Sequence, residues 1–438
     1  MPLVFVHGVN NRMSPAYRKE VAARDALFQA HLLDPLAARD ARWSGLTIVN
    51  PYWGQHGATF RWAGATVPEV RVLEHLGAED ALAGTGGPTP VADERLASVV
   101  DALAAAGGPA GPLEPLGGAE NGALKRAALA NPVRFVEAVL GPLLFGEWDL
   151  AMDGADDPVA VGRREALLLT AADAAARDGT VRAAIAAAGD DAAVLDVLRD
   201  ATRARFEAAL AAESGAPAPG GRLEGLGIAD DFAALASRAG ELFERAKGAP
   251  LRVASLAVLE RTREDVSVQV GQFLGDAFEY LVRRGDAGHP GPIVTDVLGA
   301  IEGAPRRRPD EPLVVVTHSM GGNIFYDIVT HFAPRLAVDA WVSVGGQVGQ
   351  LEEMKLFKQS DLSLMAPNKV GGLRPRVGTW LNVFDPADAF SFRAEPVFAD
   401  ARDAVYSTGS NLATSHVNYF KRPSFYRLLL DHLAGVLG

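Results

Sequence analysis

The sequence of 438 residues contains no cysteine. Disulfide bridges, thiolate metal sites and cysteine nucleophiles are therefore all excluded, and any chemistry falls to serine, threonine, histidine and carboxylate side chains. Basic residues are also fewer than acidic ones, because the chain has 42 Lys and Arg but 54 Asp and Glu, and its net charge is -12. A chain with this balance has no general attraction for phosphate backbones, so we expect no nucleic-acid partner.

Long hydrophobic runs are missing as well. No stretch reaches the roughly 18 to 20 uninterrupted apolar residues that a membrane-spanning helix needs. The first eight residues have no basic region, and their apolar run is too short for a signal peptide. These absences predict a cytoplasmic protein without a transmembrane segment, whose contact with membranes is at most peripheral.

The composition that remains is that of a globular chain, with 48% hydrophobic and 22% charged residues. Short apolar, β-branched runs separated by helical patterns predict the buried strands of a parallel sheet, and hence an α/β fold with a mostly parallel sheet flanked by helices. The expected strands are 3–6, 46–49, 313–316, 340–344 and 377–384, with a weaker candidate at 404–407.

Between about residues 56 and 255 the chain is rich in alanine, glycine and proline and shows no strand rhythm. We predict that residues 1–55 and 256–438 form one α/β core and that residues 56–255 form a large helical cap inserted after the second strand. The apolar stretch 133–148 within the cap fits either a lid that meets lipid or a buried cap helix. The chain returns to the core through a long helix, whose apolar face is expected to carry Val266, Val270, Phe273, Leu274, Ala277, Phe278 and Leu281.

The most informative segment is LVVVTHSMGGNIF (313–325), in which a buried strand meets a helix through Ser319. This pattern is typical of a nucleophile elbow, where the serine occupies a tight turn and small residues two places away let strand and helix approach. Gly321 fits that rule, whereas Thr317 replaces the usual glycine. The alternative is an ordinary serine that caps a helix.

A serine nucleophile needs a base, and the base needs an orienting acid. His416 is the predicted base, because it lies in a loop after the last expected strand and before the terminal helix 425–436. Two carboxylates at the end of strand 377–384 compete for the acid. Asp388 is favoured, because Pro386 begins a turn that lifts it beyond the strand end, and Asp385 is the alternative acid or a turn-forming residue.

Acyl transfer also requires donors for the negative charge that develops on the attacked carbonyl oxygen. The amide of Met320 follows the nucleophile at a helix N-terminus, where the helix dipole assists. The second donor is expected from the loop His7-Gly8-Val9-Asn10 after the first strand, and we choose the amide of Val9. His7 is interpreted as shaping that loop and not as a base.

At these residues the chain resembles the α/β-hydrolase superfamily, specifically its lipase-like serine esterases, over both ends of the sequence but not over the insertion. The segment FDPADAFSFRAEP (384–396) is similar to the corresponding stretch of DDHD-domain phospholipases, where the last Asp of the turn precedes an aromatic-Arg-x-Glu-Pro run. That similarity supports Asp388 over Asp385. The segment HVNYF (416–420) is similar to their terminal His-x-Asp-Tyr-Trp, with Asn418 in place of the Asp. The resemblance implies cleavage of an ester in a lipid or another acyl substrate.

The sequence therefore predicts a serine carboxylic ester hydrolase of the lipase or phospholipase type, working through an acyl-enzyme without metal or cofactor. Ser319 attacks, His416 moves the proton, Asp388 orients the imidazole, and the amides of Val9 and Met320 hold the oxyanion. The expected partner is a small-molecule or lipid acyl ester. Two other hypotheses remain: a catalytically silent binding or interaction module with a hydrolase fold, and the same triad acting on thioesters or amides.

Overall fold

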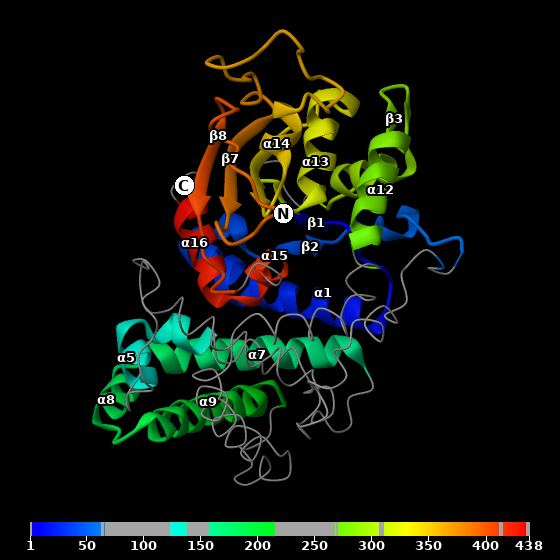
Figure 1. Ribbon diagram of the computed structural model, residues 1–438. Helices are drawn as coiled ribbons and strands as arrows, with labels where there is room; N and C mark the ends of the chain where they lie inside the picture. The colour runs from blue at the N-terminus through cyan, green and yellow to red at the C-terminus, as the bar shows by residue number, and fades with distance from the viewer. Residues whose placement is uncertain are drawn as a thin grey trace, which may run out of the picture. The chain divides into compact units, whose positions relative to one another are not determined.

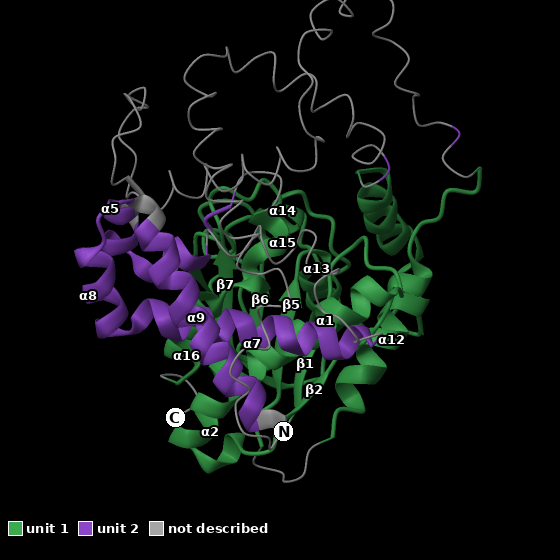
Figure 2. Cartoon of the chain, turned by 90° about the horizontal axis from the view of Figure 1, so that it is seen from below, with its two compact units in different colours: residues 1–63, 269–408, 412–438 green, residues 64–268, 409–411 purple. Residues whose placement is uncertain are grey.

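A computed structural model of the chain describes residues 2–62, 65, 123–137, 157–214, 268, 270–305, 311–410 and 415–434 (Figure 1). The chain forms two compact units, coloured separately in Figure 2. Unit 1 comprises Met1–Ala63, Gln269–Thr408 and Leu412–Gly438, and unit 2 comprises Gly64–Val268 with Gly409–Asn411. The predicted insertion, 56–255, largely coincides with the first segment of unit 2, although residues 56–63 belong to unit 1 and the segment extends to Val268.

Unit 1 is built on a six-stranded sheet in which every neighbouring pair of strands is parallel. The order across the sheet is β2-β1-β5-β6-β7-β8. The strands are β1 (Pro2–Val6), β2 (Thr47–Val49), β5 (Val314–His318), β6 (Val338–Val344), β7 (Val377–Phe384) and β8 (Ala401–Val405). This sheet confirms the predicted α/β fold with a mostly parallel sheet.

The sequence located five of these strands to within two residues and misplaced the sixth. The strand β8 begins at Ala401, three residues before the predicted run 404–407. It lies at the edge of the sheet, and it contains the polar residues Arg402 and Asp403 between its buried alanines. It therefore lacks the continuous apolar run that identifies a central strand.

Helices cover both faces of the sheet, and the alternation of side chains along β1 shows how (Figure 1). On one face Val4 and Val6 join the hydrophobic core formed with α12 (Pro292–Glu302) and α13 (Met320–Asp327). On the other face the ring of Phe5 packs against Phe28 of α1 (Pro15–Phe28) and Phe420. The ring of Phe28 in turn meets Tyr426 of α16 (Pro423–Ala434).

The helix of residues 270–283 brings the chain into the core of unit 1, but its buried face differs from the expected one. Phe273, Ala277 and Leu281 pack against the core as predicted. Val270, Leu274 and Phe278 do not, since they are 49%, 47% and 61% exposed. The buried face instead includes the polar residues Asp276 and Tyr280, which periodicity in apolar residues alone does not detect.

Shorter elements complete unit 1. They are α2 (Asp34–Arg39), a two-stranded hairpin of β3 (Gly285–Asp286) and β4 (His289–Pro290), α14 (Val348–Glu353) and α15 (Ser415–Asn418). At the start of α1 the Ser14 hydroxyl accepts a hydrogen bond from the amide of Tyr17, and Pro15 occupies the first turn as expected.

The regular secondary structure described in unit 2 is helical. Its helices are α5 (Ala123–Ala130), residues 132–137, α7 (Pro158–Arg177), α8 (Gly179–Ala187) and α9 (Asp191–Ser214). Side chains of Asp157 and Asp178 cap α7 and α8. Of the apolar stretch 133–148, Phe135 and Val136 are buried, and residues 138–148 lie outside the described residues. Among the helices that the structure describes, none combines the length and apolar character that a bilayer crossing requires.

Candidate active site

Ser319 is the single residue between the end of β5 at His318 and the start of α13 at Met320. Its backbone has φ 53° and ψ −126°, a combination that non-glycine residues rarely adopt. The surrounding structure holds it there, because the amide of Ser319 donates to the carbonyl of Val344 at 2.9 Å. Strain of this kind is the hallmark of a nucleophile elbow.

Two glycines permit the close packing around this turn. A Cβ atom on Gly321 would lie 2.3 Å from the carbonyl oxygen of Val6 in β1, so only glycine allows α13 to approach that strand. A Cβ atom on Gly8 would lie 2.8 Å from the Cβ atom of Ser319. The loop after β1 therefore runs directly beside the serine.

Thr317, which replaces the usual glycine of the elbow, has a defined structural place. Its side chain is buried, and its Oγ1 accepts a hydrogen bond of 3.0 Å from the indole Nε1 of Trp341. The threonine thus links β5 to β6 through a buried side-chain hydrogen bond.

The structure brings Ser319, His416 and Asp388 together in one hydrogen-bonded relay. The Nε2 atom of His416 lies 2.9 Å from the Oγ of Ser319, and its Nδ1 lies 2.9 Å from the Oδ2 of Asp388. Ser319 comes from the turn between β5 and α13, Asp388 from the loop after β7 and His416 from α15, which is the chain order expected for this arrangement. His416 was predicted in a loop, whereas the structure has it in this short helix. In this geometry Ser319 donates to Nε2, while Nδ1–H donates to the carboxylate.

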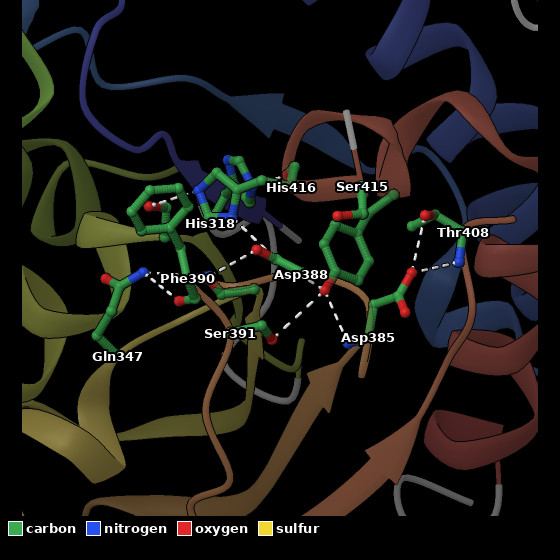
Figure 3. Close-up of polar contacts among 12 residues, drawn as sticks. His318, Gln347, Asp385, Asp388, Phe390, Ser391, Thr408, Ser415 and His416 are labelled. Carbon is green, nitrogen blue, oxygen red and sulfur yellow. Dashed lines mark hydrogen bonds and ion pairs between the residues drawn. The ribbon is translucent and has the colours of Figure 1, made fainter. Parts of the chain in front are cut away.

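The two candidate acids have different partners (Figure 3). The carboxylate of Asp388 faces His416 and also accepts from the amide of Phe390 at 2.9 Å. The carboxylate of Asp385 turns the other way and accepts from the amide and hydroxyl of Thr408 at 2.6 and 2.8 Å. Its second oxygen accepts from the amide of Ala387, so Asp385 shapes the turn.

Two residues to which the sequence analysis gave no part in the site hold the relay in place. The Nε2 of His318 lies 2.8 Å from the backbone carbonyl of His416, and the two rings lie 4.9 Å apart (Figure 3). Burial and the neighbouring His416 lower the pKa of His318 to about 3, so its neutral ring donates to that carbonyl. Tyr419 donates to Asp388 Oδ2 at 3.1 Å and accepts from the amide of Asp385 at 2.8 Å.

His7 is fixed in one tautomer by its neighbours. The amide of Trp53 donates to its Nε2 at 3.3 Å, so the proton is on Nδ1, which donates to the carbonyl of Gly8 at 2.7 Å. The ring stacks on Trp53 with an interplanar angle of 11°, and burial lowers the pKa of His7 to about 4. These contacts agree with a residue that shapes the loop after β1.

The two amides expected to bind an oxyanion belong to the loop after β1 and to the first residue of α13. The carbonyl of Gly8 accepts from His7 and from the Nδ2 of Asn11 at 3.0 Å. Because a trans peptide places its N–H opposite its carbonyl, this pairing directs the amide of Val9 to the other side of the peptide. The amide of Met320 belongs to the first residue of α13, where helix amides have no intrahelical acceptor.

Aromatic side chains form a wall beside the histidine. The ring of Phe390 lies 5.4 Å from that of His416, and Phe273 lies 4.6 Å from Phe390. The Nε2 of Gln347 donates to the carbonyl of Phe390 at 2.7 Å (Figure 3). This wall gives the site an apolar side next to His416.

Two other features bear on ligands. Within the described residues, no group of three or more His, Asp or Glu side chains is arranged to hold a metal ion. A cavity of about 440 Å³ lies between residues 55–61 and the helices that carry Tyr280 and Ile293, and none of Ser319, His416 and Asp388 lines it.

Comparisons with protein families, with curated proteins and with solved structures found no significant match to this chain.

Proposed function

We propose that this protein is a serine carboxylic ester hydrolase of the α/β-hydrolase type. The observation that carries the proposal is the relay of two 2.9 Å contacts that joins Asp388 to His416 and His416 to Ser319. The strained backbone of Ser319 adds to it, because an ordinary helix-capping serine has extended backbone angles.

The proposed reaction has two steps, acylation of Ser319 and hydrolysis of the acyl-enzyme. Ser319 Oγ attacks the ester carbonyl while His416 Nε2 takes the hydroxyl proton, and the imidazolium that forms is stabilised by Asp388. His416 then gives the proton to the leaving alcohol, which departs and leaves an acyl-enzyme. Water activated by the same histidine hydrolyses the acyl-enzyme, and the amides of Val9 and Met320 hold the oxyanion in both steps.

We propose a lipid or other acyl ester as the substrate. The rings of Phe273 and Phe390 beside His416 support an apolar acyl group at this site, since apolar walls with few polar groups are typical of pockets for such ligands. The net charge of -12 favours neutral over anionic lipid surfaces.

A labelling experiment tests the proposal. We expect the purified chain to react with a fluorophosphonate probe and to hydrolyse p-nitrophenyl esters from acetate to palmitate. Ser319→Ala should abolish both, whereas Ser363→Ala, which removes an exposed hydroxyl that donates to Asp361, should change neither. Wild-type-like hydrolysis by folded Ser319→Ala would overturn the mechanism.

The same experiment separates the competing hypotheses. A chain that neither reacts with the probe nor hydrolyses any ester is the result expected of a binding module. If the same triad acts on another acyl bond, the probe should label the chain although no ester is hydrolysed. The chain should then cleave p-nitroanilides or acyl thioesters.

A further inference from the structure

In the loop after β1, the residue that follows Val9 has an unusual backbone conformation. Asn10 has φ 64°, in the left-handed region, which asparagine enters more readily than other non-glycine residues but at some cost in energy. The direction of the Val9 amide depends on this loop, because residues 8–10 run past Ser319 without belonging to a strand or a helix. A contact from outside the loop stabilises this conformation.

That contact is the side chain of Asp276 on the helix of residues 270–283. Its carboxylate is fully buried, and its Oδ2 accepts from the amide of Asn10 at 2.8 Å. Arg12 binds both carboxylate oxygens, at 2.7 and 3.0 Å, and Oδ1 also accepts from the amide of Ala58 at 2.7 Å. The charge of Asp276 is thereby paired, and four donors converge on one carboxylate.

Two further contacts show that the loop after β1 and the segment after β2 both pack closely around the carboxylate of Asp276. Arg12 also donates to the carbonyl of Ala58 at 2.9 Å, which closes a ring of hydrogen bonds between the two segments. A Cβ atom on Gly57 would lie 2.4 Å from Asp276 Oδ1, so the chain passes the carboxylate as closely as glycine permits. The carboxylate therefore fixes the backbone of the loop at Asn10 and the backbone of the segment after β2 at Ala58.

We infer that Asp276 is a positioning residue for the oxyanion site: it holds Asn10 in its left-handed conformation and so directs the amide of Val9 toward the carbonyl that Ser319 attacks. This inference rests on the proposed hydrolase function. Asp276 acts through the backbone of the loop and touches neither the nucleophile nor the substrate. Loss of its charge therefore weakens binding of the transition state more than binding of the ester.

The chain offers a matched control in Asp327, a second fully buried aspartate. Its carboxylate accepts from Tyr280 at 2.8 Å, from Arg284 at 2.7 Å and from the amide of Lys358 at 3.1 Å. These partners do not include the loop after β1. Asp327→Asn thus removes a comparable buried charge without touching the loop that carries Val9.

The experiment compares Asp276→Asn, Asp327→Asn and wild type in the full chain, with p-nitrophenyl butyrate as substrate and a fluorophosphonate to count active sites. For Asp276→Asn we expect kcat per active site to fall about 10- to 100-fold with KM changed less than about threefold, because removing one oxyanion donor costs about 10²- to 10³-fold and here the donor is only misdirected. Affinity for a trifluoromethyl ketone, whose adduct carries an oxyanion, should fall by a similar factor. Asp327→Asn should keep kcat per active site and this affinity.

The outcomes are distinguishable. Wild type that is inert to both ester and probe contradicts the proposed function itself. Active wild type with an Asp276→Asn variant of unchanged kcat and unchanged inhibitor affinity overturns the inference alone. If Asp276→Asn does not fold, Arg12→Lys decides, since it leaves the carboxylate in place but loses the two-point contact: a fall of about three- to tenfold in kcat supports the inference, and an unchanged kcat overturns it.

Discussion

The hydroxyl of Tyr419 and the Nδ1 of His416 both lie within hydrogen-bond distance of the same oxygen, Oδ2 of Asp388, at 3.1 and 2.9 Å. Burial raises the pKa of Tyr419 far above its usual value, so the phenol keeps its proton and remains a donor. The carboxylate is therefore held by two donors, and Tyr419 helps to fix its orientation toward His416.

Tyr419→Phe is expected to lower kcat about three- to tenfold and the free energy of unfolding by about 1 to 2 kcal/mol, because a buried hydrogen bond is lost and the amide of Asp385 loses its acceptor. Tyr406→Phe is the matched control, since its hydroxyl pairs with Ser424 away from the relay. Ester kinetics and urea unfolding measure both effects. Equal kcat values for the two variants would contradict the assigned role.

The two aspartates after β7 are expected to separate catalysis from stability. Asp388→Asn should lower kcat by about 10³- to 10⁴-fold with the fold intact, because an amide at this position favours the wrong tautomer of His416. Asp385→Asn should instead lower the melting temperature, since it weakens the bonds to Thr408 while leaving kcat within about threefold. The opposite pattern would make Asp385 the acid.

Thr317 provides a test of the elbow itself. Thr317→Val is expected to lower the free energy of unfolding by about 1 to 3 kcal/mol, because the buried Nε1–H of Trp341 loses its acceptor while the volume is conserved. Thr317→Ser keeps the hydroxyl and should retain most of that stability. Chemical denaturation of both variants measures the difference, and equal stabilities would show that the hydrogen bond contributes little.

The burial of His7 predicts how stability depends on pH. Its pKa is about 4 in the folded chain against the ordinary 6.5, so the unfolded chain binds the proton first as the pH falls. The free energy of unfolding should therefore decrease between pH 6.5 and pH 4, and His7 should account for roughly 3 kcal/mol of that decrease.

Urea denaturation of Ser319→Ala across this range measures the slope without interference from turnover. His7→Gln, which cannot take up the proton, should show a shallower slope than its parent between the same pH values. An identical slope in both chains would show that other groups are responsible.

The amino-acid sequence alone was sufficient to predict the strands that consist of continuous apolar runs. The strands β1 and β7 were located closely because each is buried along most of its length. The order of Ser319, Asp388 and His416 along the chain was informative for a similar reason: parallel strands end at one edge of the sheet, so residues that follow them come together.

The sequence was not sufficient for Asp276, His318 and Tyr419. Asp276 lies on a helix whose apolar residues predict a different buried face, and only the structure shows its carboxylate enclosed by Asn10, Arg12 and Ala58. The role of His318 depends on a backbone carbonyl almost a hundred positions away. A signal for Tyr419 was present, because it follows His416 by three residues and one helical turn places such residues on one side.

The position of β1 between β2 and β5 has a consequence for how the chain folds during its synthesis. Leu3 pairs with Ile48 on one side and with Val314 on the other. During synthesis the first strand can join β2 early, but its second edge has no partner until most of the chain has left the ribosome. Folding of unit 1 is therefore expected to be slow and governed by long-range contacts, and the nascent chain should depend on protection of that open edge.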